Sequence, residues 1–373
     1  MKKLILTISG MALFIIMVTL VINLNGQNKS VRLKAETNKN ISNKKSTNNN
    51  SMLEKKLKGT NFSGSVIIVK NGKTIDSYTR GEKNRNTHAN NTDSTSFEIN
   101  SLQKSLTAGL VMEQVKKGKI KLTDKVSKFF PELPGSKEIM IRNLLDMTSG
   151  LSMKSLKLTG DSISSKALLN VITHKVIFNP EKLGAWNYQP VNFVILAEIV
   201  EKVTGQKYEK LFKDTYINRL GLNETEMAYR DYKSTKKASG YIVRNEDGNL
   251  KYSLQTPNGA TIFSELGTGQ VYMSVTDFYK ALSVLLDGKL LNEKNKSELF
   301  KSNVENKARY YSGLYTSKNN TYKYANGYGS GFENHVRISL DGKTAVVMFS
   351  NNRYVKNDGL AKKFNEIADE FLK

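Results

Sequence analysis

One stretch decides the fold: Phe97-Glu98-Ile99-Asn100-Ser101-Leu102-Gln103-Lys104-Ser105-Leu106-Thr107-Ala108. In it a polar turn runs directly into an apolar segment. Leu102, Leu106 and Leu110 recur at helical spacing, which is the apolar stripe that a helix needs in order to be buried in a core. The stretch therefore predicts a buried helix that begins at Ser101.

Ser101 and Lys104 lie three positions apart on this helix, so they share one face and are close enough to hydrogen-bond. A serine hydroxyl needs a neighbouring base to become a nucleophile, and a lysine can be that base if its surroundings depress its pKa. Two other Ser-x-x-Lys stretches begin at Ser42 and Ser234, but both lie in polar runs without an apolar stripe. A structural alternative remains, in which Ser101 only caps the helix and Lys104 is solvated.

The 373-residue chain carries a formal charge of +23 and has no cysteine. The first three residues contribute +2 and residues 25–53 contribute +5, so residues 54–373 are themselves basic at +16. Such a charge favours anionic partners, namely nucleic acid, anionic lipid or a cell-wall polymer, although a Lys- and Asn-rich composition alone also accounts for it. The lack of cysteine excludes disulfides, thiol catalysis and Cys-ligated zinc.

The run from Leu4 to Leu24 is uncharged and mostly aliphatic, and it follows Lys2 and Lys3. As a helix it would be about 31 Å long, enough to cross a bilayer. A cleaved signal peptide is the alternative, but the following residues 25–28 offer no Ala-x-Ala-like site. We therefore expect a membrane anchor at residues 1–24 and an extracellular remainder, which makes nucleic acid a poor candidate for a partner.

Residues 25–53 are rich in Asn, Lys, Ser and Thr and predict a disordered linker, followed by a single domain at 54–373. Strands are predicted at 65–69, 73–78, 334–340 and 344–350, the first two joined by Asn71-Gly72. Helical patterns prevail from 101 to about 300, and a helix at 358–372 closes the chain. This order predicts an α+β fold: an antiparallel sheet completed by distant segments, flanked by N- and C-terminal helices, plus a helical subdomain.

Several passages, taken in order, resemble the serine beta-lactamase and penicillin-binding-protein superfamily, and in particular its class C-like esterase branch. They are residues 116–132, 141–151, 196–205, 220–222 and 267–277. The resemblance implies a beta-lactamase/transpeptidase-like fold with Ser101 as nucleophile and Lys104 as its base. A narrower resemblance is to staphylococcal teichoic-acid D-alanine esterases linked to methicillin resistance. It rests on the expected anchor, the basic charge and the amino-acid sequence of residues 272–277.

The second motif of this family is Tyr-x-Asn, whose tyrosine passes a proton between nucleophile and leaving group. Tyr188 matches the tyrosine, but Pro190 stands at the asparagine position. Proline is tolerated in the first turn of a helix, yet it cannot hydrogen-bond through its side chain, so a contact to substrate or to Lys104 is lost. Asn187 and Asn192 are the amides that could compensate. The departure argues against beta-lactam turnover and permits an ester-directed variant.

The third motif is Lys-Thr-Gly or His-x-Gly on an inner strand. Its best match places Tyr328 in the cationic or His position and assigns Gly329, Ser330 and Gly331 to the oxyanion and substrate-binding strand. Residues 343–345 mimic Lys-Thr-Gly but follow a turn, so we expect them to start the next strand. With three histidines and no Gly-x-Ser-x-Gly elbow, a Ser-His-Asp triad is disfavoured, and no metal or cofactor is expected.

We therefore expect a membrane-anchored, extracellular serine acyl hydrolase that acts on D-alanyl groups of the cell envelope through an acyl-enzyme on Ser101. D-alanyl esters of teichoic acid are the favoured substrate, because a basic domain suits a polyphosphate and an ester needs less help from the missing asparagine. Two alternatives remain open. One is a D-alanyl-D-alanine carboxypeptidase or low-affinity penicillin-binding protein acting on peptidoglycan, and the other is a non-catalytic protein that binds wall polymer.

Overall fold

The computed structural model describes residues 51–156, 158, 164–228, 234–300, 307–356 and 359–372. The chain divides into two units, residues 1–47 and 48–373, and the described residues all belong to the second. None of the helices in these ranges is long and apolar enough to cross a membrane. The anchor expected at 1–24, and all of the expected linker except residues 51–53, lie outside the described residues.

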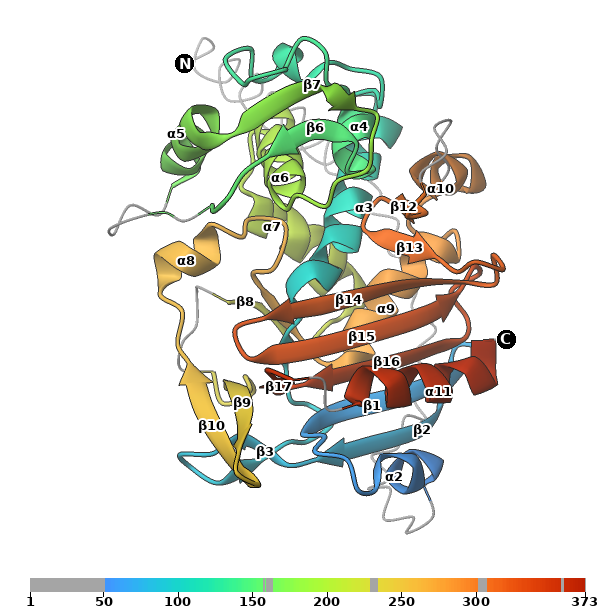
Figure 1. Cartoon of the computed structure of the whole chain (residues 1–373). Helices are drawn as coiled ribbons and strands as arrows, with labels where there is room; N and C mark the ends of the chain where they lie inside the picture. Colours follow the sequence, from blue (N-terminus) through green and yellow to red (C-terminus); the bar gives the residue numbers. More distant parts are fainter. Residues whose placement is uncertain are drawn as a thin grey trace, which may run out of the picture. The chain divides into compact units, whose positions relative to one another are not determined.

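This unit contains both helices and strands (Figure 1). The helices are α2 (Met52–Leu57), η1 (Asn100–Leu102), α3 (Gln103–Lys116), η2 (Val126–Lys128), α4 (Ile141–Leu145), α5 (Ser165–Lys175), α6 (Val191–Thr204), α7 (Tyr208–Phe212), η3 (Lys213–Asn218), α8 (Gly259–Phe263), α9 (Val275–Leu286), α10 (Glu293–Phe300) and α11 (Leu360–Leu372). The strands are β1 (Gly64–Lys70), β2 (Lys73–Arg80), β3 (Glu82–Asn84), β4 (Ala89–Asn90), β5 (Phe97–Glu98), β6 (Ser149–Ser152), β7 (Ile177–Leu183), β8 (Thr225–Met227), β9 (Gly240–Glu246), β10 (Asn249–Gln255), β11 (Val271–Met273), β12 (Tyr310–Tyr311), β13 (Leu314–Thr316), β14 (Tyr322–Gly329), β15 (Phe332–Ser339), β16 (Ala345–Ser350) and β17 (Asn352–Tyr354).

A seven-stranded antiparallel sheet is the centre of the unit. Its strands run in the order β12-β13-β14-β15-β16-β1-β2, so the first and last parts of the domain meet where β1 pairs with β16, with Ile67 opposite Val347. Asn71 and Gly72, both with positive φ, form the tight turn between β1 and β2 that such a hairpin favours. The predicted antiparallel sheet, completed by segments from both ends of the domain, is confirmed.

Both faces of this sheet are covered, and its strands β1 and β16 are apolar on both sides over most of their length. Val66 and Ile68 of β1 belong to the core shared with α2 and α11. Ile67 and Val69, which point the other way, belong to the core that contains α3 and α9. This alternation follows from the two-residue period of a strand. Figure 1 shows α2 and α11 on one side of the sheet, as the predicted flanking helices.

The helical region lies beyond the β14 edge of the sheet (Figure 1). Its centre is α6, which packs against α3 and α4 and is buried over most of its length. Gly205, in a left-handed conformation (φ 68°), ends this helix, as glycine commonly does. Because α3 contacts both α6 and α9, it joins the helical region to the sheet, and its amino-terminal end lies where the two meet.

The structure contains strands in the 101–300 region for which mainly helix was predicted. The β9–β10 hairpin turns at Asp247 and Gly248, which both have positive φ, as an Asp-Gly turn favours. The signal was present and was missed: Leu250, Tyr252 and Leu254 alternate with polar residues directly after this turn, as a strand with one covered face requires. At the start of the unit, Ser51 caps α2 and donates to Asp76 at 2.9 Å, so ordered structure includes residues 51–53, which the sequence assigned to the linker.

Candidate active site

Ser101 lies in η1, at the amino-terminal end of α3, and receives two hydrogen bonds. Lys104 Nζ donates to Ser101 Oγ at 2.9 Å, and Tyr188 OH donates to the same oxygen at 2.9 Å. Ser101 is partly exposed, whereas Lys104 is almost completely buried. The structure thus brings together the three residues that the sequence proposed as nucleophile, base and proton relay. A hydroxyl placed between an amine and a phenol can lose its proton to one and be reprotonated by the other.

The local backbone explains why Ser101 points into open space. Asn100, the residue before it, has φ 51°, a left-handed conformation that asparagine tolerates better than most residues. Its Nδ2 donates to the Glu98 carbonyl at 2.9 Å, which stabilises the sharp change from β5 to η1. Ser101 therefore falls in the first turn of a helix, where backbone N–H groups have no partner within the helix.

Lys104 is held from a second side by a loop of the helical region. Its Nζ also donates to the Thr268 carbonyl at 3.4 Å and lies 5.3 Å from the centre of the Tyr188 ring. These contacts restrict the lysine to one orientation, aimed at Ser101. Because a preset orientation costs no entropy during reaction, it is the arrangement that proton transfer requires.

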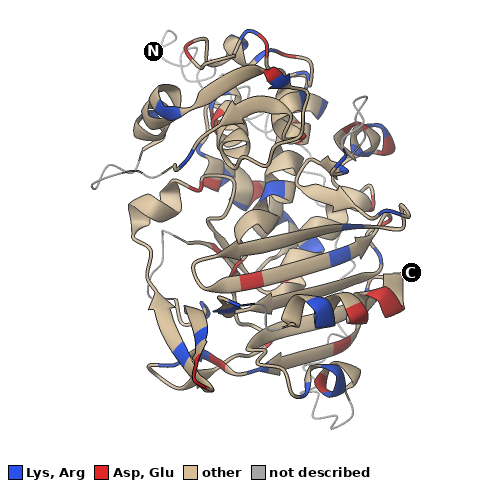
Figure 2. Ribbon diagram, viewed as in Figure 1, with Lys and Arg blue, Asp and Glu red and all other residues tan. Residues whose placement is uncertain are grey.

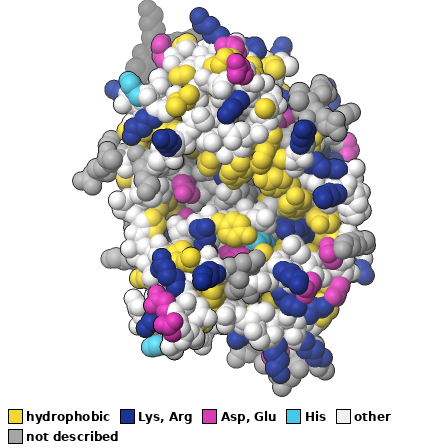
Figure 3. All heavy atoms as spheres, in the orientation of Figure 1, with side chains coloured by type: hydrophobic (Ala, Val, Ile, Leu, Met, Phe, Trp, Pro, Cys, Tyr) yellow, Lys and Arg dark blue, Asp and Glu magenta, His cyan; other side chains and the backbone are white. Residues whose placement is uncertain are grey.

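A cavity of about 320 Å³ opens in front of Ser101. Its lining consists of Ser101, Tyr188, Tyr310, Gly313, Tyr315, Ala325, Asn326 and Tyr328. Within the described part of the chain this lining contains aromatic and small residues but no lysine, arginine or histidine. Figure 3 shows hydrophobic side chains, tyrosine included, gathered in a hollowed band between the helical region and the sheet, with lysines and arginines around it.

The edge of β14 supplies backbone donors to this cavity. The Tyr322 carbonyl accepts a hydrogen bond from Ser317 N–H at 2.9 Å on the β13 side. Backbone groups of alternate residues in an antiparallel strand point the same way, so the N–H groups of Asn326 and Tyr328 also point toward this side. β13 pairs with β14 only at Tyr324 and Lys323, which leaves the edge open beside Ser101. The N–H groups of Ser101 and Tyr328 are therefore the candidate oxyanion donors.

The predicted position of the third motif is wrong by several residues. Gly329, Ser330 and Gly331 do not line the cavity; Ser330 and Gly331 form the turn between β14 and β15, with φ 47° and 82°. The glycine that the strand needs beside the nucleophile is Gly327, where a Cβ would lie 2.4 Å from the Ile99 carbonyl oxygen. Tyr328 does line the cavity, but one residue after the motif glycine.

In the family motif, lysine or histidine lies two residues before the glycine. If Gly327 is that glycine, the position of the lysine or histidine is taken by Ala325. The glycine-rich run misled the sequence assignment, because only a close approach in three dimensions distinguishes one glycine from the next. Residues 343–345, in contrast, behave as predicted: Lys343 lies in a turn and β16 begins at Ala345.

Neither of the proposed substitutes for the missing motif asparagine lines the cavity. Asn192 is fully buried; its Oδ1 accepts from Ser149 Oγ at 2.6 Å and its Nδ2 donates to the Gln189 carbonyl at 2.9 Å. Asn187 is anchored through its backbone to Met147 at 2.8 Å. Pro190 caps α6 with a helical φ of −52°, so proline fits the backbone there but supplies no side-chain amide.

Two carboxylates lie beside the nucleophile, and no sequence motif marks either of them as a site residue. Glu98 is buried beneath the end of β14, where Ser330 Oγ donates to it at 3.5 Å. Burial, and next the charge of Glu265, raise its pKa to about 8. Burial also raises the pKa of Glu265, while the positive charge of Lys104 lowers it. Glu98, Glu265 and Lys104 therefore form one electrostatic group around Ser101.

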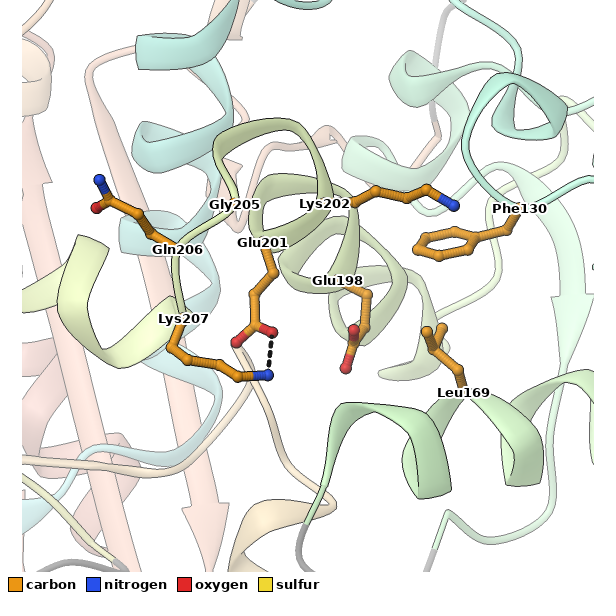
Figure 4. Close-up of a pocket in the computed structure, with 8 residues that line it drawn as sticks. All are labelled: Phe130, Leu169, Glu198, Glu201, Lys202, Gly205, Gln206 and Lys207. Carbon is orange, nitrogen blue, oxygen red and sulfur yellow. Dashed lines mark hydrogen bonds and ion pairs between the residues drawn. The ribbon is translucent and has the colours of Figure 1, made fainter.

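A second cavity, of about 370 Å³, lies at the carboxyl-terminal end of α6 (Figure 4). Glu201 binds Lys207 there at 3.1 Å. Glu198 is buried with one oxygen unpartnered, and its pKa is raised to about 8, first by burial and then by Glu201. None of these residues contacts Ser101. In the ranges that the structure describes, no group of three or more His, Asp or Glu residues could hold a metal ion.

Comparisons with known proteins agree with this geometry. A family model described as beta-lactamase matches residues 50–368. The chain is 29% identical to the putative penicillin-binding protein PbpX of Bacillus subtilis, over 82% of this chain and 75% of that protein.

The chain is also 31% identical to a teichoic acid D-alanine hydrolase of Staphylococcus aureus, over 65% of this chain and 59% of that protein. This match therefore spans less than two thirds of the relative's length. The crystal structure of FmtA from Staphylococcus aureus superposes with a TM-score of 0.73 at 26% identity, covering 84% of this chain and 87% of that one. A D-amino acid amidase from Ochrobactrum anthropi shares the fold with a TM-score of 0.68 at 18% identity, over 82% and 93% of the two chains.

Proposed function

The chain belongs to the beta-lactamase family and is a serine hydrolase, and we propose that it releases D-alanine from D-alanyl esters of teichoic acid. The observation that carries the proposal is that Ser101 Oγ receives hydrogen bonds from both Lys104 and Tyr188, at 2.9 Å each, at the mouth of a cavity whose described lining has no cationic side chain.

The mechanism proceeds through an acyl-enzyme. Ser101 Oγ attacks the ester carbonyl carbon while Lys104 accepts the hydroxyl proton. The resulting oxyanion is held by the N–H groups of Ser101 and Tyr328, and a donor of this kind is commonly worth a factor of about 10²–10³ in rate. The carbon–oxygen ester bond then breaks, and Tyr188 passes a proton to the departing alkoxide. Water, deprotonated by the same pair, attacks the acyl-enzyme and releases D-alanine and free Ser101.

The composition of the cavity supports an ester without a carboxylate near the scissile bond. A D-alanyl-D-alanine peptide and a beta-lactam both carry a carboxylate close to the bond that breaks, and burying a carboxylate without a positive partner is costly. Ala325, at the motif position of lysine or histidine, offers no such partner. The leaving group of a D-alanyl teichoic acid ester is a hydroxyl group that carries no carboxylate, so this ester does not require that partner.

The positive net charge of the chain supports a polyanionic carrier. The chain has a net charge of +23, and Figure 2 shows lysines and arginines on both the sheet and the helical region. A positive surface raises the local concentration of a polyphosphate. The name of the staphylococcal relative, teichoic acid D-alanine hydrolase, points to the same substrate. We propose further that the run from Leu4 to Leu24 anchors the enzyme, with its catalytic unit outside the cell.

The second candidate is a D-alanyl-D-alanine carboxypeptidase, which the name of the Bacillus relative favours. Incubating the full chain with D-alanylated teichoic acid and, separately, with a D-alanyl-D-alanine peptide distinguishes the two by the D-alanine that each releases. We expect release from the teichoic acid, and its loss in Ser101→Ala. Ser234→Ala is a matched control, because Ser234 also begins a Ser-x-x-Lys stretch. Release from the peptide alone would favour the carboxypeptidase.

A further inference from the structure

We propose that Glu265 binds the free ammonium group of the D-alanyl substrate and thereby selects D-alanyl esters over N-acylated D-alanyl peptides. This inference rests on the proposed function and deepens it, because it assigns a residue that binds the acyl part of the ester.

Glu265 is carried by the loop that also holds the catalytic lysine. The Glu265 carbonyl accepts hydrogen bonds from the N–H groups of Thr268 at 2.8 Å and Gly269 at 3.1 Å, and from Thr268 Oγ1 at 3.0 Å. These bonds close the loop into a tight turn. The Thr268 carbonyl in turn accepts from Lys104 at 3.4 Å. The position of Glu265 is therefore fixed relative to the nucleophile and its base.

The side chain of Glu265 turns back along this loop, toward the start of the catalytic helix. A Cβ on Gly269 would lie 2.1 Å from Glu265 Oε2 and 3.5 Å from Asn100 Cα. The carboxylate therefore fills the space that a side chain at position 269 would need, beside the residue that precedes Ser101. Gly269 does not have a positive φ, so its backbone does not call for glycine. A side chain at position 269 would have to displace the Glu265 carboxylate.

The carboxylate of Glu265 is available to a ligand. It makes no hydrogen bond or ion pair within 4 Å among the residues that the structure describes, and the residue is exposed to solvent. The surrounding protein nevertheless raises the pKa of this carboxyl group. The neighbouring Glu98 has a pKa of about 8 and so stays mostly protonated at neutral pH. Against the effect of burial, the positive charge of Lys104 lowers the pKa of Glu265 and so favours its ionised form.

The substrate has a complementary charge at the matching place. In a D-alanyl ester the ammonium group is bonded to the carbon next to the carbonyl that Ser101 attacks. A carboxylate beside Asn100 is therefore well placed to form a charge-assisted hydrogen bond with it. In a peptidoglycan stem the same nitrogen is an amide, which is neutral and followed by more chain. It would desolvate Glu265 without supplying a positive charge.

Glu265 has one structural alternative role, which is to influence Lys104 through its charge. The two roles predict different substrate dependence. An effect through Lys104 would change the hydrolysis of every ester alike, because proton transfer from Ser101 is common to all. Binding of the ammonium group concerns only substrates that have one, and it affects KM as well as kcat.

The test compares two esters of the same alcohol, D-alanyl and N-acetyl-D-alanyl, in the full chain. We expect Glu265→Gln to lower kcat/KM for the D-alanyl ester by about 10- to 100-fold, the size of a lost hydrogen bond to a charged group, with a rise in KM. The N-acetyl ester should change by less than about twofold. Glu246→Gln, at the exposed end of β9, is the carboxylate control and should leave both rates unchanged. Equal losses for both esters, or no loss for either, would overturn the inference.

A second variant tests whether the effect of Glu265→Gln is only a folding defect. Gly269→Ala keeps Glu265 but crowds its carboxylate, so we expect it also to reduce hydrolysis of the D-alanyl ester more than that of the N-acetyl ester. A uniform loss in this variant, with an unchanged melting temperature, would count against the assigned position. Failure of the proposed function looks different: wild-type protein would then show no Ser101-dependent hydrolysis of teichoic acid esters, whatever the behaviour of position 265.

Discussion

Gly327 lies directly against Ile99: a Cβ on this glycine would be 2.4 Å from the Ile99 carbonyl oxygen. This approach brings the β14 edge beside η1, and with it the Tyr328 N–H beside Ser101.

We expect Gly327→Ala to move the β14 edge away from η1 and to lower kcat by about 10²-fold or more, because one oxyanion donor is lost. Gly329→Ala would instead clash with the Asn100 side chain. Steady-state kinetics on a chromogenic ester, beside thermal unfolding, checks the Gly327 variant; full activity in a folded Gly327→Ala protein would refute the assigned oxyanion site.

The two groups that hydrogen-bond to Ser101 should act as one unit. We expect Tyr188→Phe and Lys104→Met each to lower kcat by about 10²–10⁴-fold, the usual contribution of general acid–base catalysis. The double variant should lose little more than the worse single one, because residues that act together are non-additive. Measuring all three with one ester tests this. Losses that multiply would mean that Lys104 and Tyr188 serve independent steps.

The absence of a cation at position 325 should limit reaction with carboxylate-bearing substrates. We expect Ala325→Lys to increase acylation of Ser101 by fluorescent penicillin severalfold, because the new ammonium can pair with the penicillin carboxylate. Ala325→Met, which has similar length and no charge, is the control and should not label faster. The measurement is the rate of covalent labelling at fixed penicillin concentration. Equal labelling of both variants would show that something other than charge excludes beta-lactams.

Stability should fall as the pH rises through the range in which Glu98 and Glu198 titrate. Both have folded pKa values of about 8, against an ordinary 4.5. Between these values the folded state holds more protons than the unfolded state, so stability decreases with pH. The contribution is complete below pH 4.5 and lost once pH exceeds about 8. We expect the melting temperature to fall from pH 5 to pH 9, and less steeply in Glu98→Gln and Glu198→Gln. An unchanged slope in both variants would contradict these assignments.

The sequence was informative where chemistry follows local spacing. Ser101 and Lys104 share a helix face, and the ordered passages around them pointed to Tyr188, far along the chain. The hairpin at Asn71-Gly72 was predictable because its turn residues and its apolar strands both appear in the sequence. What these features have in common is that the relevant contacts are short-range or carried by recurring patterns.

The remaining features depend on contacts that no local pattern records. Gly327, Gly329 and Gly331 look alike in sequence, and only the carbonyl of Ile99 distinguishes the first of them. Glu265 has no motif, and its significance comes from the space left by Gly269. The β9–β10 hairpin differs from these, because Asp247-Gly248 and the alternation of Leu250, Tyr252 and Leu254 are a local signal that the sequence prediction overlooked.

The central claim is that Ser101 becomes acylated by the D-alanyl group of teichoic acid. The most direct measurement is to mix the full chain with D-alanylated teichoic acid, quench in acid within the first turnovers, and locate any D-alanyl adduct by peptide mass spectrometry. The account predicts an adduct on the peptide that contains Ser101, which decays as free D-alanine appears and is absent in Ser101→Ala. Release of D-alanine with no adduct on Ser101, or undiminished release by Ser101→Ala, would contradict it.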